Sequence, residues 1–405
     1  MSSHLCKRCK KYCYNAHIKF CTKCDVSNWT SGIPLLDNLL RKEQLSTESP
    51  INLTLWTPYE NFVSIERIKS SHFSYVSKAR WREGPIKMWD REKRRFERKP
   101  NQMVVLKQIK NRNNDDLTIE EIKAHLLCKN SMVIFLYAIS QEPQSKEIVL
   151  VLQYAELGDL KTFLKPSKKD PRNLTHEEKK FKIERLLDVA SALFDIHENN
   201  LIHGDLHSGN IVFTKKNAHI CDLGQIRSSN DAEIKDIYGV LRYVAPEVLQ
   251  SRIYSQKADV YAFGMIMWEM FTCETPFKGI RSERVPFDIC DNKRPVVPLG
   301  IPKKIEGLIK RCWDPDPEKR PNSFELREIL SELADDSTEE DEETKNWLQK
   351  FDDEEVIPES SQETKSHSFN SEEVTSDSQR SSYGISDMER DDAIDISRIS
   401  MCTES

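Results

Sequence analysis

The chain has 405 residues and a mean hydropathy of -0.62, which indicate one large or two ordinary domains with polar extensions. The overall net charge of -6 argues against a nucleic-acid-binding protein, although it does not exclude a local basic patch. The first residues lack the apolar core of a signal peptide, and no apolar run approaches the roughly 18 residues of a membrane span. We therefore expect an intracellular, cytoplasmic protein with neither a nucleic-acid nor a membrane partner.

Cysteines are concentrated in residues 1–28, where two C-x-x-C pairs are separated by a short spacer. In an intracellular protein, cysteines are thiols or metal ligands rather than disulfides. Two such pairs match a tetrahedral zinc site, because each pair presents two thiolates to one ion. The smallest predicted set of zinc ligands is Cys6, Cys9, Cys21 and Cys24. Cys13 and His17 are further candidates, and the alternative is a reduced tail without metal.

Residues 29–59 are expected to form a short helix and a linker. Apolar residues at positions 35, 36, 39 and 40 follow the spacing of an amphipathic helix. We expect this helix to pack on the domain that follows, and residues 46–50 to form the linker.

Strands and polar turns alternate in the next part of the chain. Apolar patterns predict strands at residues 62–68, 73–79, 103–109, 133–139 and 148–154. The charged stretch 82–99 predicts a solvated hairpin extension, with a docking surface as the alternative. Lys107 interrupts the third strand, and a buried lysine must be either paired or functional. Helices are predicted at residues 115–128 and 176–199.

The stretch 201–213 (LIHGDLHSGNIVF), followed by 219–224 (HICDLG), places three oxygen-bearing side chains at turns between short apolar strands. Asp205, Asn210 and Asp222 can together hold a divalent cation and leave one carboxylate to accept a proton. Phosphoryl transfer needs both functions. The alternative is a set of loop residues that only cap turns, which the complete spacing disfavours.

These motifs resemble the protein kinase family, whose catalytic loop H-R-D-L-x-x-x-N and metal-binding D-F-G they nearly reproduce. The similarity is greatest to the tyrosine-kinase-like branch, particularly its expanded fungal families. It implies an α+β, two-lobed fold over residues 60–333, with a small antiparallel β-sheet lobe plus one helix and a large, mainly helical lobe. The acidic, Ser-rich residues 334–405 are expected to be a disordered tail.

The resemblance also implies roles for individual residues. Asp205 would be the catalytic base, Lys107 would contact the phosphates of ATP, and Asn210 and Asp222 would bind Mg²⁺. Glu121 is favoured over Glu120 as the partner of Lys107. The implied nucleotide-binding positions are Lys107, Glu121, Val76, Val105, Leu152, Gln153, Ala155 and Val212.

Other implied roles are structural. His203 would brace the catalytic loop, Asp259 would anchor the loop backbone, and Glu247 of the A-P-E motif would pair with Arg320. Ser228, Ser229 and Tyr238 are candidate modification sites, or ordinary polar loop residues.

The chain departs from the family pattern at several positions. Lys69, Ser71 and Ser74 stand where the glycine-rich loop has its three glycines, which normally let backbone N–H groups approach the phosphates. Gly204 replaces the arginine of H-R-D. His207 replaces the lysine common in serine/threonine kinases, and its imidazole is expected to reach the γ-phosphate.

Three functions follow from these patterns. The first is an ATP- and Mg²⁺-dependent protein kinase acting in intracellular signalling on a protein hydroxyl, with Ser or Thr preferred over Tyr. The second is a pseudokinase, a scaffold module with weak or no turnover because the loop glycines are missing. The third and weakest makes the Cys-rich segment an adaptor for a partner protein.

Overall fold

The computed structural model describes residues 14–15, 20–21, 30–47, 49–90, 93, 95–110, 115–129, 131–165, 169–230 and 239–335. All of them belong to one compact unit, residues 1–338. Two strands of two residues each, β1 (Tyr14–Asn15) and β2 (Phe20–Cys21), form an antiparallel pair near the start of the chain. The predicted zinc ligands Cys6, Cys9 and Cys24, and the side chain of Cys21, lie outside the described residues.

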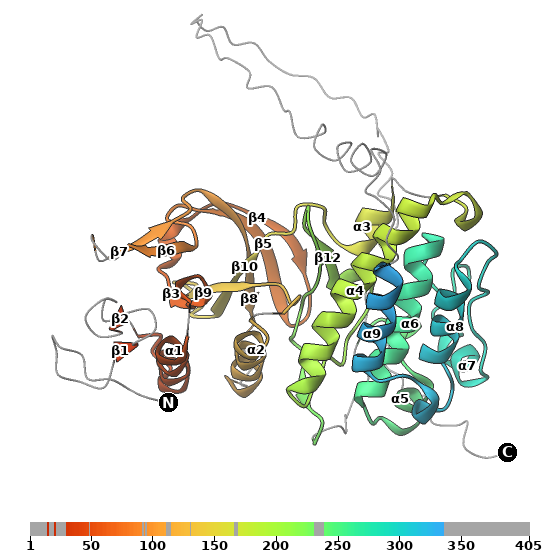
Figure 1. Ribbon diagram of the computed structural model, residues 1–405. Coiled ribbons are helices and arrows are strands. Elements are labelled where there is room, and N and C mark those ends of the chain that lie inside the picture. Colours follow the sequence, from red (N-terminus) through yellow and green to blue (C-terminus); the bar gives the residue numbers. More distant parts are fainter. Residues whose placement is uncertain are drawn as a thin grey trace, which may run out of the picture. The chain divides into compact units, whose positions relative to one another are not determined.

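The small lobe is built on a six-stranded sheet with the order β3-β9-β10-β8-β5-β4 (Figure 1). Its strands are β3 (Leu55–Trp56), β4 (Phe62–Ser70), β5 (Ser74–Trp81), β8 (Gln102–Ile109), β9 (Leu136–Gln141) and β10 (Ile148–Gln153). Neighbouring strands are antiparallel except β3, which pairs parallel to β9. The sheet is therefore mixed, whereas the sequence predicted an antiparallel one.

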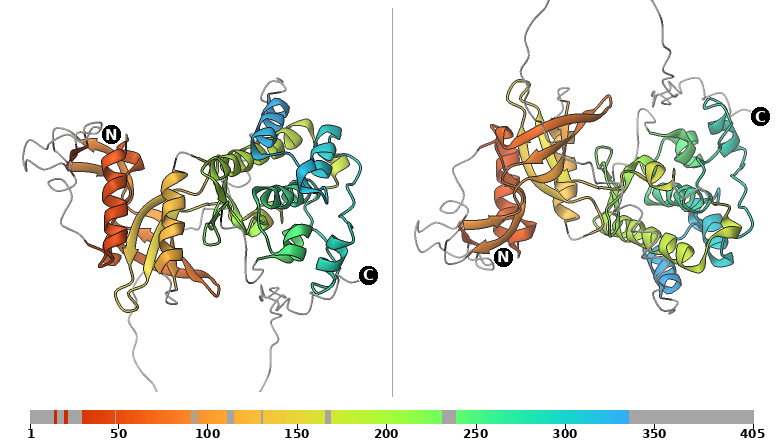
Figure 2. Two further views of the ribbon diagram at one scale, coloured as in Figure 1. Left: turned by 90° about the horizontal axis from the view of Figure 1, so that it is seen from below. Right: turned by 90° about the horizontal axis from the view of Figure 1, so that it is seen from above.

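Two helices, both predicted from the sequence, lie along one side of this sheet: α1 (Pro34–Ser46) and α2 (Asp115–Leu127) (Figures 1 and 2). The fully buried Leu36 and Leu40 of α1 share a hydrophobic core with Ile119 and Ile122 of α2. The expectation that the first helix packs on the following domain is confirmed. Residues 29–59, expected to be a helix and a linker, also supply strand β3 of the sheet.

The charged stretch 82–99 forms the predicted hairpin, in which β6 (Ile86–Asp90) and β7 (Arg95–Arg98) are antiparallel. The strand predicted at 133–139 begins later, at Leu136. Val133 instead makes an isolated parallel bridge to Ile220 in the large lobe before the chain joins the sheet.

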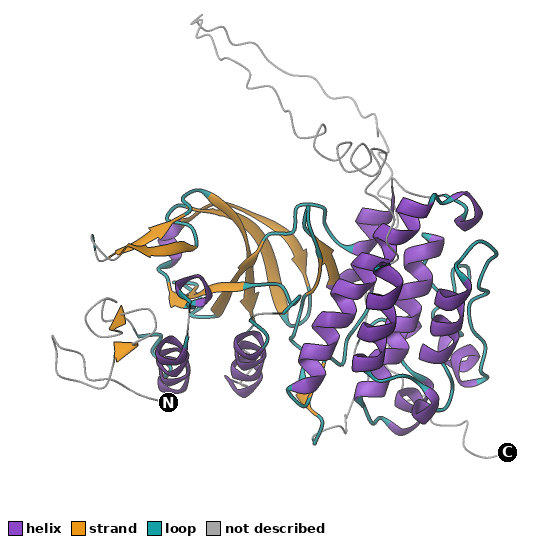
Figure 3. Cartoon of the chain, in the orientation of Figure 1, coloured by secondary structure: helices purple, strands orange, loops and turns teal. Residues whose placement is uncertain are grey.

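The large lobe is mainly helical (Figure 3). Its helices are α3 (Leu160–Leu164), α4 (His176–Glu198), α5 (Pro246–Ser251), α6 (Gln256–Thr272), α7 (Val285–Cys290), α8 (Lys303–Cys312) and α9 (Ser323–Ala334). A capping box, formed by Thr175 and Glu178, starts α4. Helix α6 carries apolar residues on all sides and is buried from Ala258 to Phe271, so it forms the centre of the lobe.

Two small antiparallel pairs carry the motifs at the junction of the lobes. They are β11 (Leu201–Ile202) with β14 (Arg227–Ser228), and β12 (Ile211–Phe213) with β13 (Ala218–Ile220). Short 3₁₀ helices occur at Pro50–Asn52, Tyr59–Asn61, Pro171–Asn173, Ser208–Asn210, Leu241–Tyr243 and Pro317–Lys319. Among the described residues, no helix combines the length and apolar character needed to cross a membrane.

Candidate active site

Lys107 lies on β8 and points to the helix side of the sheet, where α2 supplies its first partner. Its Nζ atom donates a 2.6 Å hydrogen bond to Oε1 of Glu121, and both side chains are buried. The neighbouring Glu120 is exposed and pairs with Lys123 instead. Successive residues of a helix point about 100° apart, so only one of the two glutamates can face the sheet. The structure places Glu121 there.

Asp222, from the turn after β13, is the second partner of Lys107. The distance between Lys107 Nζ and Asp222 Oδ1 is 2.6 Å, and Gly224 N donates to the same oxygen at 3.2 Å. Burial raises the pKa of Asp222, but the charge and hydrogen bond of Lys107 outweigh it and bring the pKa below its ordinary value. The carboxylate is therefore ionised and offers hard oxygen atoms of the kind that Mg²⁺ prefers.

The loop between β11 and β12 is held from below by Asp259 at the start of α6. Its two carboxylate oxygens accept hydrogen bonds from His203 N at 2.8 Å and Gly204 N at 3.0 Å. The ring of His203 is fully buried and accepts from Asp205 N at 3.2 Å. The predicted anchoring of this loop by Asp259 is confirmed.

Asp205 and Asn210 lie together on this loop. Asn210 Nδ2 donates to the backbone oxygen of Asp205 at 2.8 Å and approaches its carboxylate at 3.4 Å. These contacts involve the amide nitrogen, so the amide oxygen of Asn210 faces away from Asp205. That oxygen and the Asp222 carboxylate are a donor set suited to Mg²⁺, which takes one or two protein ligands beside phosphate oxygens.

His207 is held inside the catalytic loop. Its Nδ1 accepts a hydrogen bond from Gly209 N at 3.0 Å, and its Nε2 lies 3.8 Å from Asp205 Oδ1. Burial, followed by the charge of Lys69, lowers the pKa of His207 to about 3. The imidazole is thus neutral at physiological pH, and it shapes the loop beside Asp205 rather than adding a positive charge.

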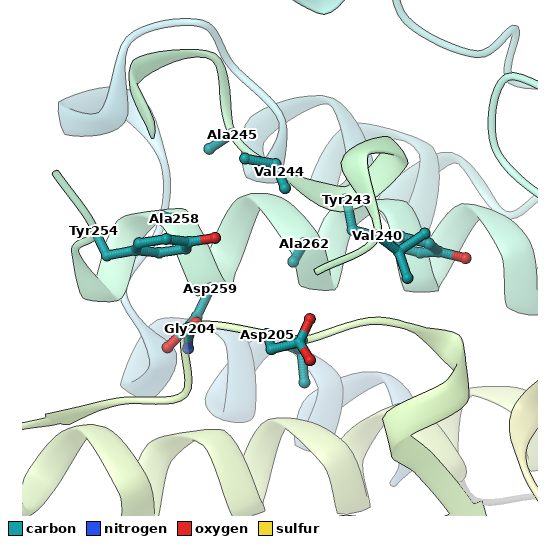
Figure 4. Close-up of a pocket in the computed structure, with 11 residues that line it drawn as sticks. Gly204, Asp205, Val240, Tyr243, Val244, Ala245, Tyr254, Ala258, Asp259 and Ala262 are labelled. Atoms are coloured by element: carbon teal, nitrogen blue, oxygen red, sulfur yellow. Dashed lines mark hydrogen bonds between the residues drawn. The ribbon is translucent and has the colours of Figure 1, made fainter. Parts of the chain in front are cut away.

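The backbone at Gly239 lies against Asp205. A Cβ atom at this position would lie 2.5 Å from Asp205 Oδ1, and its φ of +107° also favours glycine. Next to it, Gly204, Asp205 and Val240 line a cavity of about 20 Å³ (Figure 4), roughly the space of one water molecule. The backbone at Gly239 therefore leaves no room for a side chain beside the carboxylate of Asp205.

The remaining predicted nucleotide-binding residues lie on or next to strands β5, β8, β10 and β12. Val105, Leu152 and Val212 pack in or against one core cluster, and Val105 is directly opposite Leu152 across β8 and β10. Val76 on β5 is directly opposite Lys107. Gln153 ends β10, and its N–H bonds Phe135 O. Ala155 follows, and its carbonyl oxygen accepts from Gly158 N at 3.3 Å.

The turn between β4 and β5 is closed by Ser71. Its Oγ accepts hydrogen bonds from Ser74 N at 3.0 Å and Phe73 N at 3.3 Å, and Ser71 N donates to Ser74 O at 2.9 Å. Backbone N–H groups that a glycine-rich loop would offer to phosphates are satisfied within the turn.

Sequence reasoning missed two features around the catalytic loop. Gly204 has a φ of +74°, and the guanidinium of Arg227 lies 3.3 Å from the position of a Cβ there. Arg227 of β14 thus brings a positive charge close to position 204, where the family motif has its arginine. A second buried network joins Ser208, Tyr243 and Glu269. The only sequence signal for either was their proximity to the recognised motifs.

The A-P-E motif is fixed by the predicted ion pair. Arg320 is fully buried at its side chain, and its two terminal nitrogens bond the two carboxylate oxygens of Glu247 at 2.7 Å each. The bidentate pair links the start of α5, which carries Glu247, to the loop before α9, which carries Arg320. This prediction is confirmed.

The sequence is similar to those of known proteins. The family model described as protein tyrosine and serine/threonine kinase matches residues 62–331, two thirds of the chain. Among similar curated proteins is a serine/threonine/tyrosine-protein kinase HT1 of Arabidopsis thaliana, 31% identical over 45% of this chain and 46% of its own length. The dual specificity protein kinase zakA of Dictyostelium discoideum is 30% identical over 44% of this chain and 24% of its own.

An inactive tyrosine-protein kinase 7 of Mus musculus is also similar, with 33% identity over 46% of this chain and 18% of its own length. The chain thus matches less than half the length of each of these relatives. The match over residues 62–331, together with the two-lobed fold, shows that the chain belongs to the protein tyrosine and serine/threonine kinase family.

Proposed function

We propose that this chain is an active protein kinase that transfers the γ-phosphate of ATP to a hydroxyl of a protein substrate. The observation that carries the proposal is the convergence of four side chains from both lobes. Lys107 of the small lobe bonds Asp222 of the large lobe at 2.6 Å, and Asn210 bonds Asp205. All four chemical groups that phosphoryl transfer needs are therefore retained.

Each of these groups has a distinct role in the proposed reaction. Asp205 orients the attacking hydroxyl and accepts its proton. Lys107, kept protonated because two carboxylates outweigh the effect of burial on its pKa, binds the α and β phosphates. Asn210 and Asp222 would hold Mg²⁺, which neutralises phosphate charge when bound.

Transfer to Ser or Thr is the proposed specificity. The names of the plant and amoeba relatives, serine/threonine/tyrosine-protein kinase and dual specificity protein kinase, are compatible with this choice but do not select it over Tyr. Phosphoamino-acid analysis of a degenerate peptide mixture phosphorylated by the protein tests this choice. Recovery of phosphotyrosine alone would contradict it.

A second candidate function is a pseudokinase scaffold that binds partners without efficient turnover. The turn closed by Ser71 favours it, because that turn satisfies its own N–H groups. A relative that is named as inactive is compatible with a chain that lacks turnover.

Mg²⁺-dependent transfer of labelled phosphate from ATP distinguishes the two functions. The purified full chain should label a protein substrate or itself. Asp205→Asn, which keeps the size of the side chain but removes the base, should lower the signal at least about 100-fold. Equal labelling by both proteins, or labelling by neither, would refute the kinase proposal.

The N-terminal zinc site remains a separate proposal, supported by the spacing of the four cysteines and by the short β1–β2 pair between them. Zinc measured per chain should fall from about one to zero in a Cys21→Ser, Cys24→Ser variant. A role for this segment as an adaptor for a partner protein depends on the same result.

A further inference from the structure

The register of the small-lobe sheet places Lys69 on the cleft side. Lys69 of β4 is directly opposite Val76 of β5, and Val76 is directly opposite Lys107 of β8. Residues directly opposite each other on antiparallel strands share one face of a sheet. Lys69, Val76 and Lys107 therefore form a row across three strands on the face from which Lys107 reaches Asp222.

The preceding residues of β4 support this placement. The register shifts between Arg67 and Lys69, so Ile68 is the extra residue of a bulge. Arg67 lies over the ring of Tyr75, with 3.9 Å between Cζ and the ring centroid. Tyr75 is adjacent to Val76 and so points to the opposite face. Arg67 and Lys69 thus place two positive charges on opposite faces of one strand.

The side chain of Lys69 is exposed. Within the part of the chain that the structure describes, no hydrogen bond or ion pair involves its side chain. On the same face, Lys78 is paired with Glu66 at 3.0 Å. The charge of Lys69 also acts on the large lobe, because it adds to the larger effect of burial in lowering the pKa of the buried His207.

We propose that Lys69 is a phosphate-binding residue of the nucleotide site, whose ammonium group contacts the phosphates of a nucleoside triphosphate. It takes over the role of the turn N–H groups that Ser71 occupies. Lys69 stands at the first glycine position of the loop, one strand beyond Val76. The ammonium groups of Lys69 and Lys107 lie at the two ends of this row, and both can donate charge-assisted hydrogen bonds to phosphate oxygens.

This inference rests on the proposed nucleotide site, and its test measures binding rather than turnover. The affinities of the full chain for Mg-ATP and for adenosine are measured by calorimetry for wild type, Lys69→Met, Lys69→Arg and Arg67→Met. Arg67→Met is the matched control, since it removes one positive charge from the other face of the same strand.

Lys69→Met should weaken Mg-ATP binding about 10- to 100-fold, as expected for a lost hydrogen bond to a charged group, and leave adenosine binding unchanged. Lys69→Arg should retain most of the affinity for Mg-ATP, and Arg67→Met should bind both ligands like wild type. Because Lys69 is exposed, its variants should also melt at the wild-type temperature.

The outcomes separate this inference from the proposed function. Unchanged Mg-ATP affinity in Lys69→Met, or an equal loss for adenosine, overturns the role of Lys69 while the kinase proposal stands. A wild-type chain that binds Mg-ATP through Lys69 but transfers no phosphate refutes the kinase proposal alone. A wild-type chain that binds no nucleotide overturns both.

Discussion

Replacing Leu40 by alanine tests whether helix α1 is part of the folded kinase domain. Leu40 and Leu36 are fully buried, in one core with Ile119 and Ile122 of α2 and with Leu150 of the sheet. Removing a buried leucine side chain costs about 2–5 kcal/mol, depending on how far the surroundings collapse. Because the free energy of unfolding of a domain is only about 5–15 kcal/mol, this loss would be a large share of the stability.

The same helix provides a matched control. Leu35, one residue before Leu36, is 54% exposed, so Leu35→Ala has the same helix propensity change without a cavity. It should cost less than about 0.5 kcal/mol. Urea unfolding followed by circular dichroism gives both values, and the slope against denaturant should stay constant.

A cost for Leu40→Ala no larger than that for Leu35→Ala would refute the packing of α1 on α2. The result also bears on the site, because α2 carries Glu121, the partner of Lys107. If α1 holds α2 in place, Leu40→Ala should also lower the rate of phosphate transfer, and Leu35→Ala should not.

Three further predictions concern buried charges. Glu247→Gln leaves the fully buried guanidinium of Arg320 without its anion and should cost about 3–5 kcal/mol in urea unfolding, whereas no loss would contradict a buried pair. Burial lowers the pKa of His125 and His207 to about 3 from an ordinary value of 6.5, so the unfolded chain binds more protons between those values. The free energy of unfolding should therefore fall as pH falls from about 6.5 toward 3, and His125→Leu should reduce this slope; an identical slope in the variant would show that His125 does not titrate on unfolding. Burial raises the pKa of Glu269 to about 7 from 4.5, so here the folded chain holds more protons. The contribution of Glu269 to the free energy of unfolding therefore has the opposite sign and is lost as pH rises from about 4.5 to 7. Comparing the free energies of unfolding of Glu269→Gln and wild type at both ends of that range isolates this contribution. The same difference at both pH values would contradict the pKa shift.

Much of the site was readable in the sequence because its residues sit on local motifs. Asp205 and Asn210 belong to one loop, and Asp222 follows a strand that pairs with the strand after that loop. Such short-range arrangements are fixed by turn and strand patterns. The position of Lys107 within an apolar strand likewise predicted that this lysine would be paired with a charged partner or be functional.

Features that depend on contacts distant in the sequence were less accessible. The sequence predicted a linker before the sheet, but β3 from that segment pairs with β9, more than eighty residues later. It also left open whether the imidazole of His207 is neutral or charged, and only its burial in the folded loop makes this ring neutral. Burial and pairing of this kind arise only when the lobes and their elements pack.

By itself, the sequence determined the identities of the side chains that phosphoryl transfer needs, because motif spacing is a local property, and its resemblance to the protein kinase family implied the two-lobed fold. Only the tertiary structure decided which face of β4 carries Lys69, because a one-residue bulge reverses the side on which a strand residue points. It also decided that Ser71 satisfies the N–H groups of its own turn, because hydrogen-bond partners depend on the backbone path and not on residue type alone.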